Sequence, residues 1–128
     1  MPEPEAQVAE PQFSEQEIAD AKDAMCEAWD KTYRAIRATG EQSDADPSHA
    51  YFVAVNTRLA FHASADYLTD TLRDNPATPL DLREDVKQLA SAYYFTAISQ
   101  LGNAHQSEFE LSNAQMDAAD ARLHSACN

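Results

Sequence analysis

Residues 78–103 read TPLDLREDVKQLASAYYFTAISQLGN, and this stretch carries the clearest helical pattern in the chain. Its apolar residues recur at steps of three and four, which is the spacing of one face of an α-helix. These residues are Leu82, Val86, Leu89, Tyr93, Ala97 and Leu101, with Ile98 beside them. Start signals at Thr78 and Pro79 and a stop signal at Gly102 therefore predict a helix at about 79–102.

Three other segments have the same periodicity and similar end signals. A capping box of Ser14 and Glu17 begins the first of them, and Gly40 is expected to end it. Asp46-Pro47 predicts the start of the second, and a further capping box at Ser107 predicts the start of the last. The four expected helices are, in chain order, 15–38, 47–74, 79–102 and 108–127.

These helices predict an all-α fold. No segment alternates apolar and polar residues as a strand does, and both glycines fall at expected helix ends. Because the connections are short, we expect an antiparallel up-down-up-down four-helix bundle over residues 13–128. Residues 1–12 hold three of the six prolines and three glutamates, so we expect them to be a disordered tether.

The second helix has the widest apolar surface. Apolar residues on its main side are Phe52, Val55, Leu59, Ala63, Tyr67 and Leu72. Phe61, Ala65 and Leu68 extend the apolar surface to a second side. We therefore expect this helix to lie deepest in the bundle.

The charge of the chain excludes some partners. With 9 Lys and Arg against 22 Asp and Glu, the formal net charge is 9 − 22 = −13. The basic residues form no cluster that could neutralise phosphates, so we expect no nucleic-acid partner. No run of 18 or more apolar residues occurs, and we expect no direct membrane insertion by this chain.

Cys26 and Cys127 lie on the first and last helices, which should be neighbours. If the last helix began level with the end of the first, it would pass beyond Cys26 before it reached Cys127. Because a disulfide needs α-carbons within about 7 Å, a bridge requires the last helix to begin beyond the end of the first. The first turns of the first helix would then overhang the last one. From the residues alone, a disulfide and two buried thiols are both open.

No catalytic constellation is visible, and we expect no enzyme activity and no cofactor. Nucleophile elbows, phosphate loops and Glu-x-x-His pairs are all missing from the sequence. His62 with Asp66, and Asp120 with His124 near Cys127, are each two ligands one turn apart. Two ligands do not make a metal site, which normally needs three or four.

Two sets of side chains are candidate binding residues. Trp29, Tyr94 and Phe95 are candidate contact residues. Three consecutive aromatic residues at 93–95 cannot all point into the core, so we expect Tyr94 or Phe95 to be partly exposed. Asn56, His62 and Asn113 are candidates for the polar wall of a small pocket. Core packing and helix-to-helix hydrogen bonds are the simpler explanations for both sets.

Several motifs together resemble the extracytoplasmic helical domain of actinobacterial, especially mycobacterial, alanine- and proline-rich single-pass membrane proteins. The motifs are Phe13-Ser14-x-x-Glu17-Ile18, Cys26-x-Ala28-Trp29, Asn56-x-Arg58-Leu59-Ala60, Ala77-Thr78-Pro79 and the final Cys127. The resemblance implies a domain outside the cytoplasmic membrane, normally tethered to an N-terminal membrane helix, with its two cysteines bridged. The family has no established activity, so the resemblance assigns no catalytic or binding residue.

The leading hypothesis is a non-enzymatic extracytoplasmic protein-interaction domain of a cell-envelope protein, with one or more envelope proteins as partners. The alternative is a helical bundle that binds a small apolar or lipid-like ligand, which the many aromatic and alanine residues favour. A metal-dependent enzyme that uses His62 and Asp66, and a substrate of a specialised secretion system, are weaker hypotheses.

Overall fold

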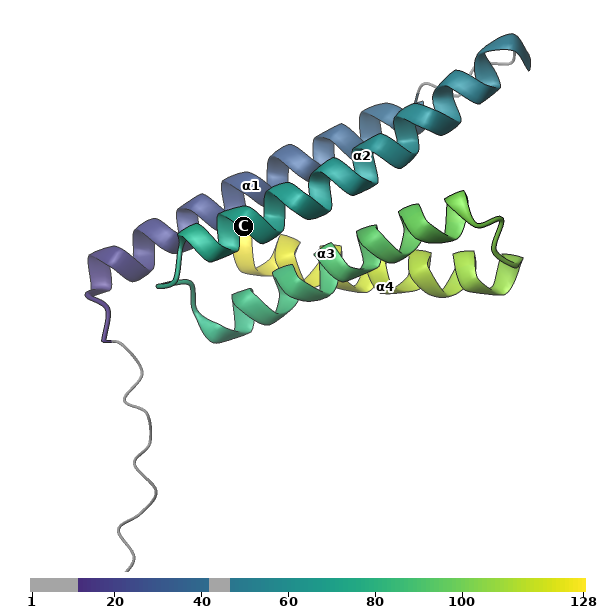
Figure 1. Ribbon diagram of the computed structural model, residues 1–128. Coiled ribbons are helices and arrows are strands. Elements are labelled where there is room, and N and C mark those ends of the chain that lie inside the picture. The colour runs from purple at the N-terminus through teal and green to yellow at the C-terminus, as the bar shows by residue number, and fades with distance from the viewer. Residues whose placement is uncertain (1–11, 42–46) are drawn as a thin grey trace, which may run out of the picture.

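The computed structural model describes residues 12–41 and 47–128, and most of them are helical (Figure 1). The helices are α1 (Glu15–Glu41), α2 (Pro47–Asp74), α3 (Leu80–Leu101) and α4 (Gln106–Cys127). Neither described range contains a strand. The predicted all-α four-helix bundle is therefore confirmed. Within the same ranges no helix is both long enough and apolar enough to cross a membrane.

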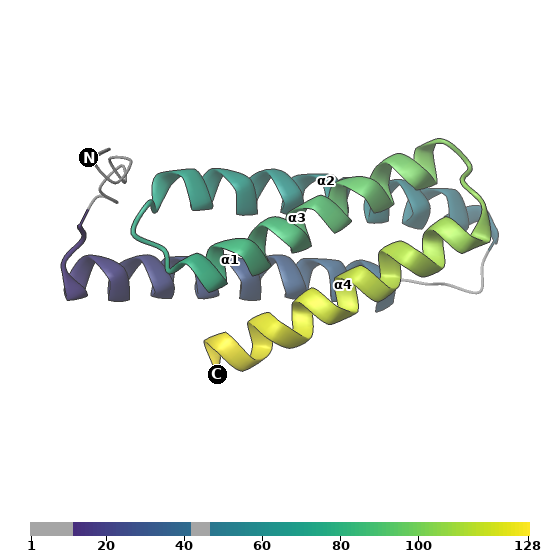
Figure 2. The ribbon, with the colours of Figure 1, turned by 90° about the horizontal axis from the view of Figure 1, so that it is seen from below.

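The bundle is built from two hairpins. Each helix packs against the next one along the chain, whereas α1 and α4 meet over a small area. The α1–α2 and α3–α4 hairpins diverge toward the end where α3 turns into α4 (Figure 1). Along the molecule, α4 begins beyond the end of α1, and the first turns of α1 extend past the end of α4 (Figure 2). This is the offset that a bridge between the two cysteines requires.

The core is centred on α3, which packs against both α2 and α4. Nine of its residues are buried, among them Val86, Leu89 and Tyr93, compared with five on α2. The prediction that the second helix lies deepest is therefore wrong. Both α2 and α3 lie between two neighbours, but the first turns of α2 are exposed, whereas buried residues run along α3 from Leu82 to Ser99.

The first helix begins as predicted. The Ser14 hydroxyl oxygen accepts a hydrogen bond from the Glu17 backbone N–H, and the Glu17 carboxylate accepts one from the Ser14 backbone N–H, both at 3.1 Å. This reciprocal capping box satisfies two donors that a helix start leaves unpaired. The end differs, because α1 continues through Gly40 to Glu41. A glycine costs a helix only about 1 kcal/mol, so it does not by itself end one.

The starts of α3 and α4 differ from the predicted ones. Helix α3 begins at Leu80 after Pro79, and neither helix has a side-chain capping bond. The Thr78 hydroxyl instead donates to the Asn75 carbonyl oxygen at 2.6 Å, within the turn after α2. Helix α4 begins at Gln106, one residue before the predicted box at Ser107.

Candidate interaction surface

The first four turns of α2 expose large apolar side chains. Tyr51 is 78% exposed, Phe52 67% and Leu59 60%, and Val55 is also exposed. The sequence placed Phe52, Val55 and Leu59 on the core side, and this prediction is wrong. In the structure the core side of α2 is the second stripe, which is composed of Phe61, Ala65 and Leu68, and Leu72 of the expected main side is buried with it.

The last two turns of α3 expose a second group of apolar side chains. Ile98 is 66% exposed and Leu101 70%, and Phe95 is partly exposed. The sequence assigned Ile98 and Leu101 to the core stripe of this helix, but the buried stripe ends at Ala97 and Ser99. The apolar surface of α3 therefore extends beyond the part that α2 and α4 cover.

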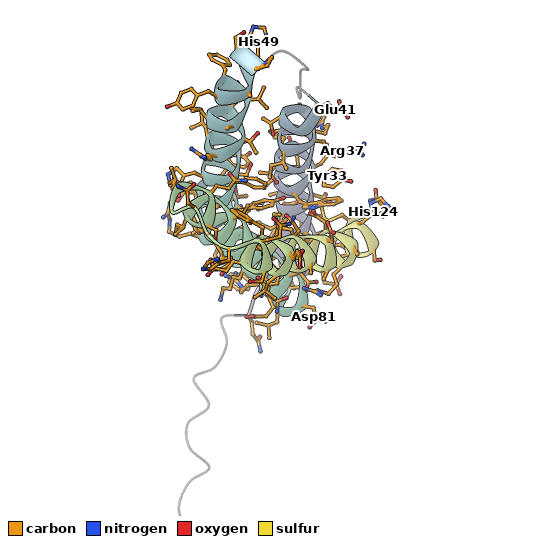
Figure 3. The ribbon with its side chains drawn as sticks, turned by 90° about the vertical axis from the view of Figure 1, so that its right-hand side faces the viewer. Tyr33, Arg37, Glu41, His49, Asp81 and His124 are labelled. Atoms are coloured by element: carbon orange, nitrogen blue, oxygen red, sulfur yellow. A yellow bond between two sulfur atoms is a disulfide. The ribbon has the colours of Figure 1, made fainter. Side chains whose placement is uncertain are left out.

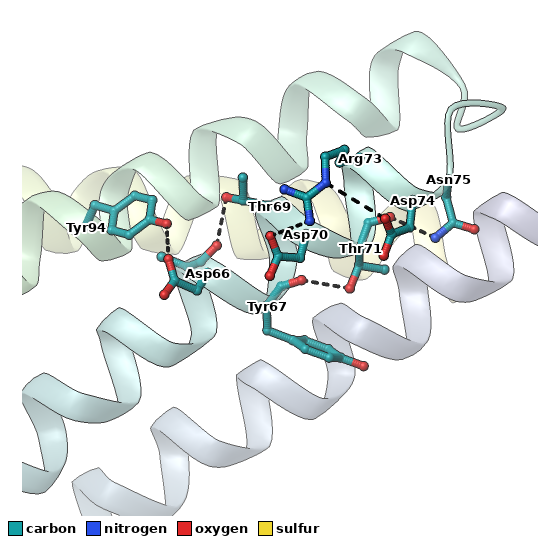
Figure 4. Close-up of polar contacts among 10 residues, drawn as sticks. Asp66, Tyr67, Thr69, Asp70, Thr71, Arg73, Asp74, Asn75 and Tyr94 are labelled. Carbon is teal, nitrogen blue, oxygen red and sulfur yellow. Dashed lines mark hydrogen bonds and ion pairs between the residues drawn. The ribbon is translucent and has the colours of Figure 1, made fainter.

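The two exposed groups meet at a polar contact between α2 and α3. The Tyr94 hydroxyl donates a hydrogen bond to the Asp66 carboxylate, and this bond raises the pKa of Tyr94 (Figure 4). His62 lies one turn from Asp66, with its Nε2 3.5 Å from a carboxylate oxygen and its ring centroid 6.0 Å from that of Tyr94. Through Tyr94, these contacts join α3 to the part of α2 that follows its exposed apolar residues.

Helical spacing extends an apolar stripe from each side of this contact. On α2, Leu59, Val55 and Phe52 continue the row of His62 at steps of three and four. On α3, Ile98 and Leu101 continue the row of Tyr94 in the same way. We call the seven exposed side chains at the diverging ends of these helices the V surface. It is composed of Tyr51, Phe52, Val55, Leu59, Phe95, Ile98 and Leu101.

The diverging hairpins leave the V surface uncovered within the described chain. Seen from the open end, the tip of the α1–α2 hairpin, marked by Glu41 and His49, rises clear of α3 and α4 (Figure 3). Helix α2 has 28 residues and α3 has 22, so α2 is longer by about 9 Å at about 1.5 Å per residue. The extra length of α2 therefore has no neighbouring helix on this side.

The V surface lies in the two long stretches of the chain that have no acidic residue. None of the 22 Asp and Glu residues falls within 47–65 or 86–107. The charged residues in these stretches are Arg58 and Lys87, apart from the histidines. This surface was not predicted from the sequence. The two stretches without acidic residues are the sequence feature that could have indicated it.

The predicted contact residues differ in exposure. Trp29 is 5% exposed and is a core residue, so it does not belong to an exposed contact surface. Tyr94 is half-buried in its contact with Asp66, and Phe95 is exposed at the edge of the V surface. The expectation that Tyr94 or Phe95 is partly exposed is confirmed.

Cys26 and Cys127 form a disulfide, with their α-carbons 5.5 Å apart. The disulfide that the resemblance implied is therefore present, and the alternative of two buried thiols is wrong. It joins α1 to α4 beside a second contact, in which the Trp29 indole N–H donates to Asp120 Oδ1 at 3.0 Å. Burial raises the pKa of Asp120, and the hydrogen bond from Trp29 offsets part of that effect.

The disulfide removes one ligand from the second weighed metal set. Cys127 is bridged to Cys26, so it cannot join Asp120 and His124 as a third ligand. An open hollow of about 550 Å³ lies beside them, lined by Tyr33, Asp117 and His124 among others. In the described ranges no three His, Cys, Asp or Glu side chains come together to hold a metal ion.

The predicted pocket residues do not come together. His62 and Asn113 are exposed and Asn56 is half-buried, and no hydrogen bond joins any two of them in the part of the chain that the structure describes. His62 instead pairs with Asp66 on its own helix. The three residues therefore do not form the polar wall of one pocket.

Comparison with known proteins gives no further assignment. No protein-family model matches the chain, and no curated protein or solved structure matches it either.

Proposed function

We propose that this chain is a non-enzymatic protein-interaction domain of an extracytoplasmic, cell-envelope protein of the actinobacterial type, and that it contacts its partner through the V surface. The observation that carries the proposal is the exposure of seven large apolar side chains on two adjacent helices. Taking about 200 Å² for a fully exposed large side chain, they present roughly 800 Å² to solvent. This figure sums the exposures of the seven residues, and exposed apolar surface of more than a few hundred Å² gathered on one face marks an interaction site.

The disulfide supports the compartment in the proposal. Disulfides persist in oxidising surroundings outside the cytoplasm and are rare inside it. Cys26 and Cys127 are the two cysteines of the chain, and the bridge uses both. Alkylation of thiols in intact cells, followed by intact-mass measurement, tests this part. We expect no alkylated cysteine before reduction, and a chain that takes up two alkyl groups would contradict the proposed compartment.

Photo-cross-linking tests the contact surface. A photoreactive amino acid at position 52 should give a discrete cross-linked product in actinobacterial cells, because Phe52 is 67% exposed near the projecting tip of α2. The matched control is position 80, where Leu80 is 62% exposed at the opposite end of α3. Equal or absent products at the two positions would contradict an interaction through the V surface.

A further inference from the structure

We propose that the occupant of the V surface is a second copy of this chain, so that two copies pair across a two-fold axis with their V surfaces in contact. This inference rests on the proposed function and names the partner. In a two-fold pair the same surface serves both copies, so that surface must be self-complementary in charge and in apolar character. The V surface meets both requirements.

The first argument is area. A stable interface of standard size buries about 800 Å² on each partner. The seven exposed side chains present an area of this size, estimated above as roughly 800 Å². Tyr51 and Phe52 lie at the tip of the longer helix, and Ile98 and Leu101 at the end of the shorter one. Each copy therefore offers both an apolar projecting helix and an apolar face for the other copy's projecting helix.

The second argument is charge. Each copy carries a formal net charge of −13, so two copies repel one another over most of their surface. Their approach is least unfavourable where carboxylates are missing, and the stretches 47–65 and 86–107 contain none. A basic partner protein would find no carboxylate on the V surface to pair with. The charge distribution therefore favours a second copy over a basic partner.

Sedimentation equilibrium of the full chain, with its disulfide intact, tests the proposal. Concentrations from roughly 1 to 500 µM cover the micromolar and tighter affinities of interfaces of this size. We expect reversible dimers of twice the 14.1 kDa chain mass. Raising NaCl from about 0.1 M to 1 M shortens the screening length from about 10 Å to about 3 Å and should strengthen the dimer. The affinity for a basic partner would instead fall as the NaCl concentration is raised.

Two variants and one control locate the interface. Leu59→Asp on α2 and Ile98→Asp on α3 each add a carboxylate to an exposed position, so both should fold and both should weaken the dimer about tenfold or more. Leu80→Asp adds the same charge at a similarly exposed leucine outside the V surface and should change the dimer constant by less than about twofold. Circular dichroism establishes that all three variants remain helical.

Three outcomes would overturn the inference. A chain that stays monomeric over the whole concentration range has no affinity for a second copy. A dimer that Leu80→Asp weakens as much as Leu59→Asp does is not built on the V surface. A cross-linked product from position 52 that contains a different protein refutes the second copy but supports the proposed function, whereas no product at all refutes both.

Discussion

Removal of the Cys26–Cys127 disulfide should destabilise the folded chain by several kcal/mol. The bridge joins residues that are 101 positions apart. In the chain-entropy model, closing a loop of that length stabilises the fold by about 4.7 kcal/mol through its effect on the unfolded chain. Helices α1 and α4 otherwise meet over a small area, chiefly where Trp29 contacts Asp120 and His124. Little else would therefore replace the constraint.

Thermal unfolding followed by far-UV circular dichroism measures this effect. For a domain of this size a loss of that order lowers the melting temperature by roughly 15–20 °C. Wild-type chain in reductant and the double variant Cys26→Ala/Cys127→Ala should melt at similar temperatures, and the variant should not respond to reductant. Melting within about 5 °C of the oxidised chain in both cases would refute the argument, because it would mean that the packing of α3 against its neighbours determines stability by itself.

Three further predictions concern the core and the helix ends. Asp120→Asn keeps an acceptor for the Trp29 indole N–H and removes a partly buried charge, so it should raise the melting temperature at neutral pH. The pKa of Asp120 in the folded chain lies above its ordinary value of 3.8, so the stability of the wild-type chain should fall as pH rises through the window just above 3.8. Thermal melts across that window should show a smaller fall for the Asp120→Asn variant. Leu68→Ala should cost about 2–5 kcal/mol in chemical denaturation, whereas Leu59→Ala should cost less than about 0.5 kcal/mol; equal losses would mean that α2 packs with the other stripe inward. Ser14→Ala removes half of the capping box and should cost about 0.5–2 kcal/mol in the same assay, and no loss would show that the start of α1 does not depend on the cap.

The helices and their order could be predicted from the sequence because the signals for them are local. The spacing of apolar residues at steps of three and four involves residues within one or two turns of a helix. The reciprocal hydrogen bonds of Ser14 and Glu17 are equally local. The ends were less predictable where two signals compete. Gly40 can end a helix or be carried inside one, and here α1 continues to Glu41, whose carboxylate lies 3.9 Å from Arg37 one turn earlier.

The covered face of α2 could not be predicted, because periodicity identifies an apolar stripe without saying what packs on it. Helix α2 has two such stripes, one through Phe52 and Leu59 and one through Phe61 and Leu68. Which stripe becomes core depends on how α1 and α3 pack against the helix, and that is a property of the whole fold. The lack of acidic residues at 47–65 is a sequence signal, but it indicates a solvent-exposed interface only once the core is known.

Trp29 shows the same limit for a single side chain. A lone tryptophan is typical of both cores and interfaces, since its ring is apolar and its N–H needs an acceptor. The acceptor here is Asp120, which lies 91 residues away in the sequence. Only the contact between α1 and α4, beside the disulfide, brings the two side chains together.

The most direct test of the central claim is backbone-amide NMR of the full chain as its concentration is raised. If the V surface is where two copies meet, concentration-dependent shifts should be confined to residues near 51–62 and 94–104. Amides around Leu80 and the start of α1 should remain unchanged. Shifts centred instead on the hollow beside Trp29 and His124, or no shifts at any concentration, would contradict the account.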